Sequence, residues 1–96
     1  EAIAEFGEVV RRDPQNLRAQ IGLGETYLRA GDLDRAATHL EAAVGTGRPV
    51  TRAWNSLGEV YARRGDAARA TGAWKKSLAI DPAQPEIRKR LSGSGG

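Results

Sequence analysis

The segment Trp54–Pro82, WNSLGEVYARRGDAARATGAWKKSLAIDP, decides the fold of this chain. Its first part carries four residues at spacings of i, i+3, i+4 and i+7, namely Trp54, Leu57, Gly58 and Tyr61. Residues at these spacings share one face of a helix. The spacing therefore predicts an amphipathic helix with a glycine among large side chains.

The second part of the segment predicts another helix. Gly65-Asp66 interrupts the first helix, and Ala70, Trp74 and Ser77 then share a face at i, i+4 and i+7. Asp81-Pro82 ends this helix, because the residue before a proline is pushed out of the α region. Together the two parts predict a helix hairpin with small residues, Gly58 and Ala70, where the helices cross.

This hairpin resembles one tetratricopeptide repeat (TPR), since it matches W-x2-L-G-x2-Y, then A-x3-aromatic, then Pro. The resemblance implies an all-α fold, a TPR-like right-handed α-solenoid of antiparallel helix hairpins. The aromatic residues Trp54 and Trp74 match packing positions of the family. We therefore expect them in the core rather than as platforms on which a ligand stacks.

The same pattern recurs 34 residues away, which is the TPR period. The offset links Gln20 to Trp54, Leu23 to Leu57, Gly24 to Gly58, Tyr27 to Tyr61, Gly31 to Gly65, Ala36 to Ala70 and Leu40 to Trp74. It also runs backwards, from Ala36, Leu40 and Val44 to Ala2, Phe6 and Val10. Because Gln20 and Leu40 replace two aromatic residues, we expect the earlier repeat to be the softer one.

The period predicts about six helices in one TPR-like domain, residues 1–91. Residues 1–15 form the second helix of a truncated repeat, 16–49 and 50–84 are full repeats, and 85–91 form a capping helix whose Ile87 and Leu91 share a face. Asn16 and Asp32 are expected to cap helices, and Gly31 to end one. The two glycines of 45–49 predict a looser linker and a local bend. The segment 92–96, SGSGG, has the composition of a flexible tail or an expression scar.

Composition limits the class of protein. Of 96 residues, 40% are hydrophobic and 28% charged, which suits a folded chain in water, and there is no Cys for a disulfide or thiolate metal site. No apolar run approaches the roughly 20 residues of a membrane span. No signal peptide is visible, but the chain starts at Glu1 without Met, so processing could have removed one. The compartment therefore stays open, with a slight preference for the cytoplasm.

Charge and catalytic motifs exclude several functions. The net charge of +3 is spread among acidic residues, and the basic run Arg88-Lys89-Arg90 has no aromatic neighbour, so nucleic acid is not the expected partner. His39, the one histidine, is expected to face outward and has no second ligand for a metal. The Gly-Thr-Gly of 45–47 lacks the Lys of a P-loop. We expect no enzyme, no metal and no cofactor.

The resemblance also implies where a ligand would bind, because the first helix of each repeat lines the concave side of such a solenoid. The candidate groove residues are Arg18, Ile21, Glu25, Leu28, Arg52, Asn55, Glu59, Arg63 and Lys89. The TPR clamp for chaperone tails carries Lys and Asn where this chain has Ile21 and Glu25, so a chaperone-tail receptor of that kind is not expected.

Three hypotheses follow. The leading one is a non-catalytic protein–protein interaction module that binds a peptide or partner helix in the groove. The alternative is a scaffold that forms a homo-oligomer through an exposed apolar stripe on its first helix, Ile3, Phe6 and Val9. The third is nucleic-acid binding through Arg88 to Arg90, which would fall steeply with salt.

Overall fold

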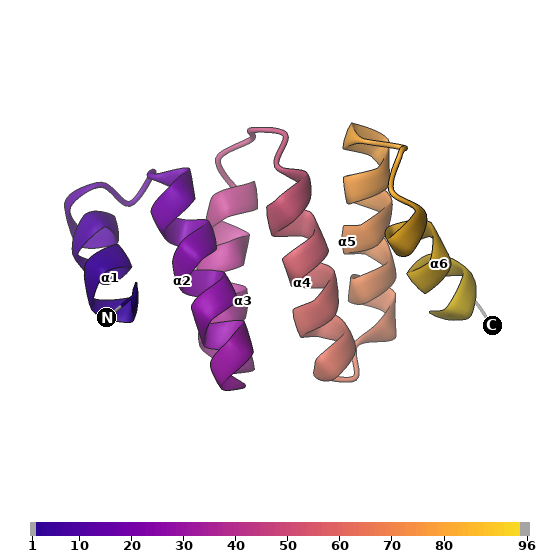
Figure 1. Ribbon diagram of the computed structural model, residues 1–96, viewed down its shortest axis with the longest axis horizontal. Coiled ribbons are helices and arrows are strands. Elements are labelled where there is room, and N and C mark those ends of the chain that lie inside the picture. The colour runs from indigo at the N-terminus through magenta and orange to yellow at the C-terminus, as the bar shows by residue number, and fades with distance from the viewer. Residues whose placement is uncertain (1, 95–96) are drawn as a thin grey trace.

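Six helices form a row in the computed structural model, which describes residues 2–94 (Figure 1). They are α1 (Ala2–Arg12), α2 (Leu17–Ala30), α3 (Leu33–Val44), α4 (Thr51–Arg63), α5 (Ala67–Ile80) and α6 (Pro85–Ser94). Contacts join each helix to the next, and α2 also contacts α4. The two chain ends lie at opposite ends of a molecule measuring 42 × 25 × 18 Å (Figure 1). The all-α, TPR-like solenoid predicted from the sequence is confirmed.

Helix ends follow the capping residues that the sequence indicates. Asn16 caps α2, its side chain accepting a hydrogen bond from the Ala19 N–H at 3.0 Å, and Asp32 caps α3 through the Arg35 N–H at 3.2 Å. Gly31 ends α2 with a φ of 84°, a left-handed conformation that glycine adopts without a Cβ clash. The last helix differs, because α6 runs to Ser94 rather than stopping at 91. Of the expected tail, residues 95 and 96 lie outside the described residues.

Glycines on the first helices allow the second helices to approach closely. A Cβ built on Gly58 would overlap the indole of Trp74, and one built on Gly24 would overlap the side chain of Leu40. Gly22 shows the same relation to the preceding helix, since its Cβ would lie 2.6 Å from the ring of Phe6. Large side chains of α1, α3 and α5 therefore lie directly on the α2 and α4 backbones.

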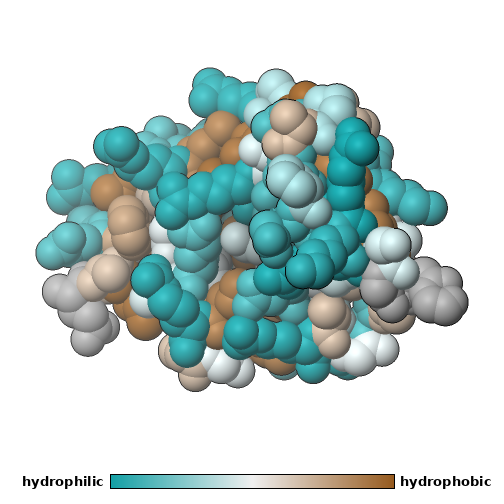
Figure 2. All heavy atoms as spheres, turned by 45° about the vertical axis from the view of Figure 1, so that its right-hand side comes forward, coloured by the Kyte–Doolittle hydropathy of each residue, from teal (hydrophilic) through white to brown (hydrophobic). Residues whose placement is uncertain are grey.

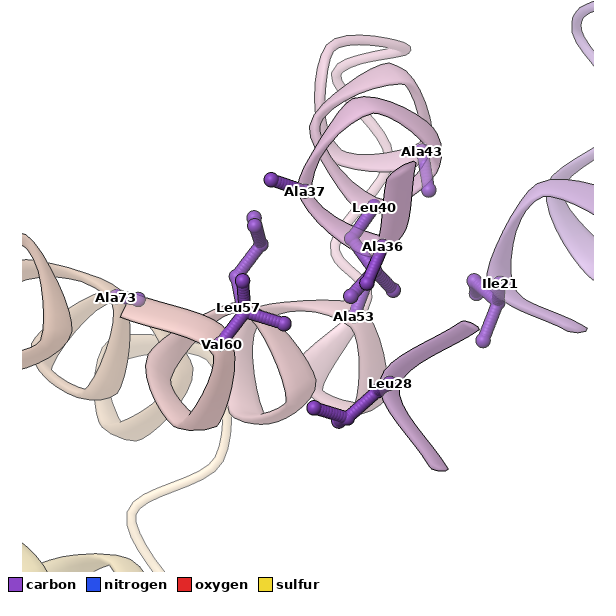
Figure 3. Packing of buried hydrophobic residues seen from close by; sticks show 10 residues of the cluster. All are labelled: Ile21, Leu28, Ala36, Ala37, Leu40, Ala43, Ala53, Leu57, Val60 and Ala73. Carbon is purple, nitrogen blue, oxygen red and sulfur yellow. The ribbon is translucent and has the colours of Figure 1, made fainter. Parts of the chain in front are cut away.

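The main apolar core lies between α2, α3, α4 and α5 (Figure 3). Its ten buried side chains include Leu40, Leu57 and Val60, which are at most 1% exposed. A smaller cluster of Ala70, Trp74 and Ile87 joins α5 to α6. At roughly 25 cal/mol per Å² of apolar surface, this burial is the main stabilising contribution. Trp74 is 5% exposed and Trp54 packs on the main cluster, as expected for core residues.

In the earlier repeat, the buried amide of Gln20 stands at the position that Trp54 occupies in the later repeat. Gln20 is only 5% exposed; its amide donates to the Pro14 carbonyl at 2.9 Å and its oxygen lies 2.8 Å from His39 Nδ1. The His39 ring also stacks on Tyr27, with centroids 5.7 Å apart. The prediction that His39 faces outward is therefore wrong: it is half-buried, and burial lowers its pKa.

The apolar stripe expected on α1 is partly covered. Phe6 is half-buried because its ring lies over Gly22, Ile3 is also half-buried, and Val9 is the exposed member at 38%. The prediction of three exposed side chains is correct for Val9 and wrong for Ile3 and Phe6. Gly22 has no side chain, which leaves room for the Phe6 ring on α2. Self-association through this stripe stays a prediction.

Exchanging Gly58 for Ala should destabilise the protein by about 1–3 kcal/mol, because the rigid indole of Trp74 has to move. Gly72→Ala is the matched control: Gly72 is exposed in α5 and its Cβ would meet nothing within 4 Å. This second change should stabilise the helix by about 0.5–1 kcal/mol. Urea unfolding followed by circular dichroism compares them, and equal effects would contradict the close-crossing explanation.

A half-buried phenol joins α3 to α4 and predicts a pH dependence. Burial, and then a 2.6 Å hydrogen bond to Glu41, raise the pKa of Tyr61 from 10.0 to about 12. The folded state thus holds this proton more tightly than the unfolded state. The stability contributed is present below pH 10 and is lost as the pH rises from about 10 to about 12.

Tyrosinate absorbance in a Tyr27→Phe protein should place the Tyr61 pKa near 12. Adding Glu41→Gln should lower this pKa, yet leave it above 10.0, because burial remains its largest cause. Titration near 10 in both proteins would show that neither burial nor the carboxylate acts on the phenol.

Candidate functional site

Two hollows open along the first helices of the repeats, α2, α4 and α6. The hollow that we call the α2 hollow has a volume of about 220 Å³ and is lined by Phe6, Arg18, Ile21, Gly22 and Arg52. The α6 hollow has a volume of about 200 Å³ and is lined by Asn55, Ser56, Glu59, Glu86, Ile87 and Arg90. Because α4 contributes to both hollows, the two lie along one continuous row of first helices.

The α2 hollow combines apolar surface with a cation. Phe6 and Ile21 provide the apolar part, and Gly22 leaves room between them because it has no side chain. Arg18 is exposed and makes no salt bridge within the described residues. A guanidinium in this setting can donate two parallel hydrogen bonds to a carboxylate.

A bidentate ion pair links α2 to α4 beside this hollow. Arg52 donates from Nε and from an Nη atom to the two carboxylate oxygens of Glu25, at 2.7 and 2.6 Å. The Ser56 hydroxyl adds a longer contact of 3.4 Å to the same carboxylate. The hydrogen bond and the charge of Glu25 raise the pKa of Arg52, so its guanidinium stays protonated. Glu25 is the more buried partner, with 18% of its side chain exposed against 72% for Arg52.

A chain of amides fixes one wall of the α6 hollow. The Gln84 amide nitrogen donates to Ser77 Oγ at 2.9 Å and to the backbone carbonyls of Asp81 and Ser77 at 2.8 and 3.2 Å. Its oxygen must therefore face Asn55, whose amide nitrogen donates to it at 2.8 Å. The Asn55 Oδ1 atom is then left buried and without a hydrogen bond from any described protein group.

The face of the molecule seen in Figure 2 is mostly hydrophilic, with apolar atoms in small separate areas. Most of its area therefore stays compatible with water, and specific recognition falls to hollows that combine apolar and polar groups.

The predicted groove residues divide between these features. Arg18, Ile21 and Arg52 line the α2 hollow, Asn55 and Glu59 line the α6 hollow, and Glu25 pairs with Arg52. Leu28, at 8% exposed, belongs to the core and lines neither hollow (Figure 3). Arg63 pairs with Glu59 at 2.6 Å, and Lys89 is exposed on α6 outside both hollows.

Sequence reasoning missed the contribution of α1 and most of α6. The missed lining residues are Phe6, Gly22, Ser56, Glu86, Ile87 and Arg90. For Gly22 a signal existed, since a second glycine two residues before Gly24 is unusual in a helix interior. Which residues of α6 line the hollow depends on how α6 is rotated against α5. Residue spacing does not determine this rotation.

Metal and membrane sites are not found in residues 2–94. No three side chains of the His, Cys, Asp or Glu type gather there in a way that could hold a metal ion. No helix within this range has the length and apolarity for crossing a bilayer. Of the basic run on α6, Arg88 donates to the Pro82 carbonyl at 3.0 Å, and Arg90 lies over the Trp74 ring.

Removing Arg52 should lower the stability of the fold more than the exposure of its side chain suggests, because the largely buried carboxylate of Glu25 would lose its partner. We expect Arg52→Met to destabilise the fold by about 1 kcal/mol, and Glu25→Gln/Arg52→Met to regain most of this loss. As a control, Arg12→Met breaks the more exposed Glu8 pair and should change stability by under about 0.5 kcal/mol. Thermal unfolding measures all four proteins, and equal losses for both single variants would refute the prediction.

Comparison with known proteins agrees with this architecture. Two family models described as tetratricopeptide repeat match residues 1–60 and 51–74. The TPR repeat-containing protein PA0015 of Pseudomonas aeruginosa is 36% identical over 72 residues, which cover 75% of this chain and 69% of that protein.

Solved structures show the same fold at lower identity. The first TPR of Spaghetti (RPAP3), bound to the HSP90 peptide SRMEEVD, superposes with a TM-score of 0.91 at 19% identity, over 97% of this chain and 74% of the other. The N-terminal domain of stress-induced protein-1 from C. elegans gives 0.87 at 18% identity, over 97% and 78%. Since a family model matches more than half of the sequence, this chain belongs to the tetratricopeptide repeat family.

Proposed function

We propose that this chain is a protein-interaction module that binds a peptide or partner helix in the groove formed by α2, α4 and α6. One observation carries the proposal. The α2 hollow and the α6 hollow follow each other along α4, and each combines apolar surface with charged side chains. A ligand that follows the row of first helices can fill both.

The dimensions support a peptide rather than a small molecule. Each hollow holds only about 200–220 Å³, below the roughly 300–1,000 Å³ of pockets that enclose drug-sized ligands. A peptide can occupy such shallow places with successive side chains, because two weak sites on one ligand add their binding free energies. Among residues 2–94, no histidine, cysteine or lysine lines either hollow, so we propose binding without catalysis.

The ion pair of Glu25 and Arg52 would give the groove its specificity, because it decides which arginine can bind a carboxylate of the ligand. A peptide carboxylate placed in the α2 hollow finds Arg18 unpaired within the described residues, whereas Arg52 is already bound to Glu25. The Spaghetti structure holds an HSP90 peptide, but the likeness to this chain is one of fold. Here Ile21 and Glu25 replace the clamp residues for chaperone tails, so a different peptide class is proposed.

The test uses a displayed library of random dodecapeptides, followed by fluorescence anisotropy with the strongest binders. Arg18→Glu should weaken their binding about tenfold, because it reverses the charge beside the apolar part of the α2 hollow. Lys76→Glu is the matched control: it makes the same charge change at an exposed position of α5 outside both hollows, and should alter the affinity less than about twofold.

Equal effects of the two substitutions would place binding outside the groove and overturn the proposal. A library from which no dodecapeptide binds the wild-type protein would overturn it as well. Circular dichroism of each variant confirms that its fold is retained.

A further inference from the structure

We propose that the α6 hollow is a subsite for a cationic side chain, lysine or arginine, of the bound peptide. This inference rests on the proposed function and specifies the chemistry of one end of the groove. The hollow is lined by two carboxylates, Glu59 and Glu86, around the apolar side chain of Ile87. A long basic side chain matches this arrangement, since its aliphatic stem covers apolar surface while its charged end stays polar.

Hydrogen bonding fixes one wall of the hollow. Gln84 donates to three acceptors on α5 and the following turn, which leaves its oxygen to receive the Asn55 amide nitrogen. Asn55 is therefore held in one orientation, and its Oδ1 atom is buried without a hydrogen bond from any described protein group. The acceptors that a donor group in the hollow can reach are the carboxylates of Glu59 and Glu86.

Two arginines lie near these carboxylates. Arg90 lines the hollow, but its guanidinium lies over the Trp74 ring, 6.0 Å from the centroid, on the α5 side. Arg63 pairs with Glu59 one helical turn away, with half of its own side chain exposed. Pairs of this type contribute only about 0.3–0.5 kcal/mol, so a ligand cation can share or replace Arg63.

The two ends of the groove then differ in charge. Arg18 gives the α2 hollow a cation without a salt bridge in the described residues, whereas carboxylates outnumber cations in the lining of the α6 hollow. A peptide would therefore bind in one direction, with its basic residue over α6.

The experiment uses the strongest dodecapeptide binders from the library and replaces each of their Lys and Arg residues by Met. We expect one replacement to weaken binding about tenfold, and Glu59→Gln/Glu86→Gln in the protein to do the same. Combined, the two changes should cost little more than either alone, because they remove the same interaction. Glu8→Gln/Asp34→Asn is the control, removing the same charge on α1 and α3, and should have less than about a twofold effect.

Binders that respond to Arg18→Glu but contain no Lys or Arg, or tolerate their replacement by Met, would overturn this subsite while leaving the proposed groove intact. Additive losses in the combined experiment would also overturn it, since the cation would then bind elsewhere. If the proposed groove itself were wrong, the binders would instead be insensitive to Arg18→Glu.

Discussion

The structure depends on the close contact between a helix backbone and a large side chain of the following helix. At Gly58 no side chain separates the α4 backbone from the indole of Trp74, and Gly24 stands in the same relation to Leu40. Any Cβ at these positions would overlap a buried group that has no free space to enter. The contact sets the distance between the two helices of each hairpin, and stacking the hairpins then places α2, α4 and α6 in one row.

The groove is a consequence of this spacing, and its polar groups also hold the repeats together. Glu25 and Arg52 connect the first helices of successive repeats, so a groove residue contributes to the geometry of the stack. Gln84 does the same at the other end, because it ties the last residues of α5 to Asn55 on α4. Recognition and repeat packing therefore share side chains, and a substitution in the groove requires a measurement of stability beside one of binding.

Local features were predictable because they depend on neighbours in sequence. The spacing around Trp54 and Trp74 predicted the hairpin, and Gly31 and Asp32 predicted where one helix ends and the next begins. His39 was misjudged because its hydrogen-bond partner, Gln20, lies on another helix. The repeat pattern leads one to expect an aromatic residue at position 20 rather than an amide. Phe6 was misjudged for a similar reason, since Gly22 accommodates its ring.

The sequence by itself determined the family, the helical hairpins and the side of each hairpin that packs, because glycine, proline and apolar spacing act over a few residues. Only the tertiary structure decided which groove candidates meet. It brought Arg18 beside Phe6, placed Leu28 in the core, and assembled the α6 hollow from α4 and α6. The physical reason is that rotation of one helix against another depends on the packing of all its contacts at once.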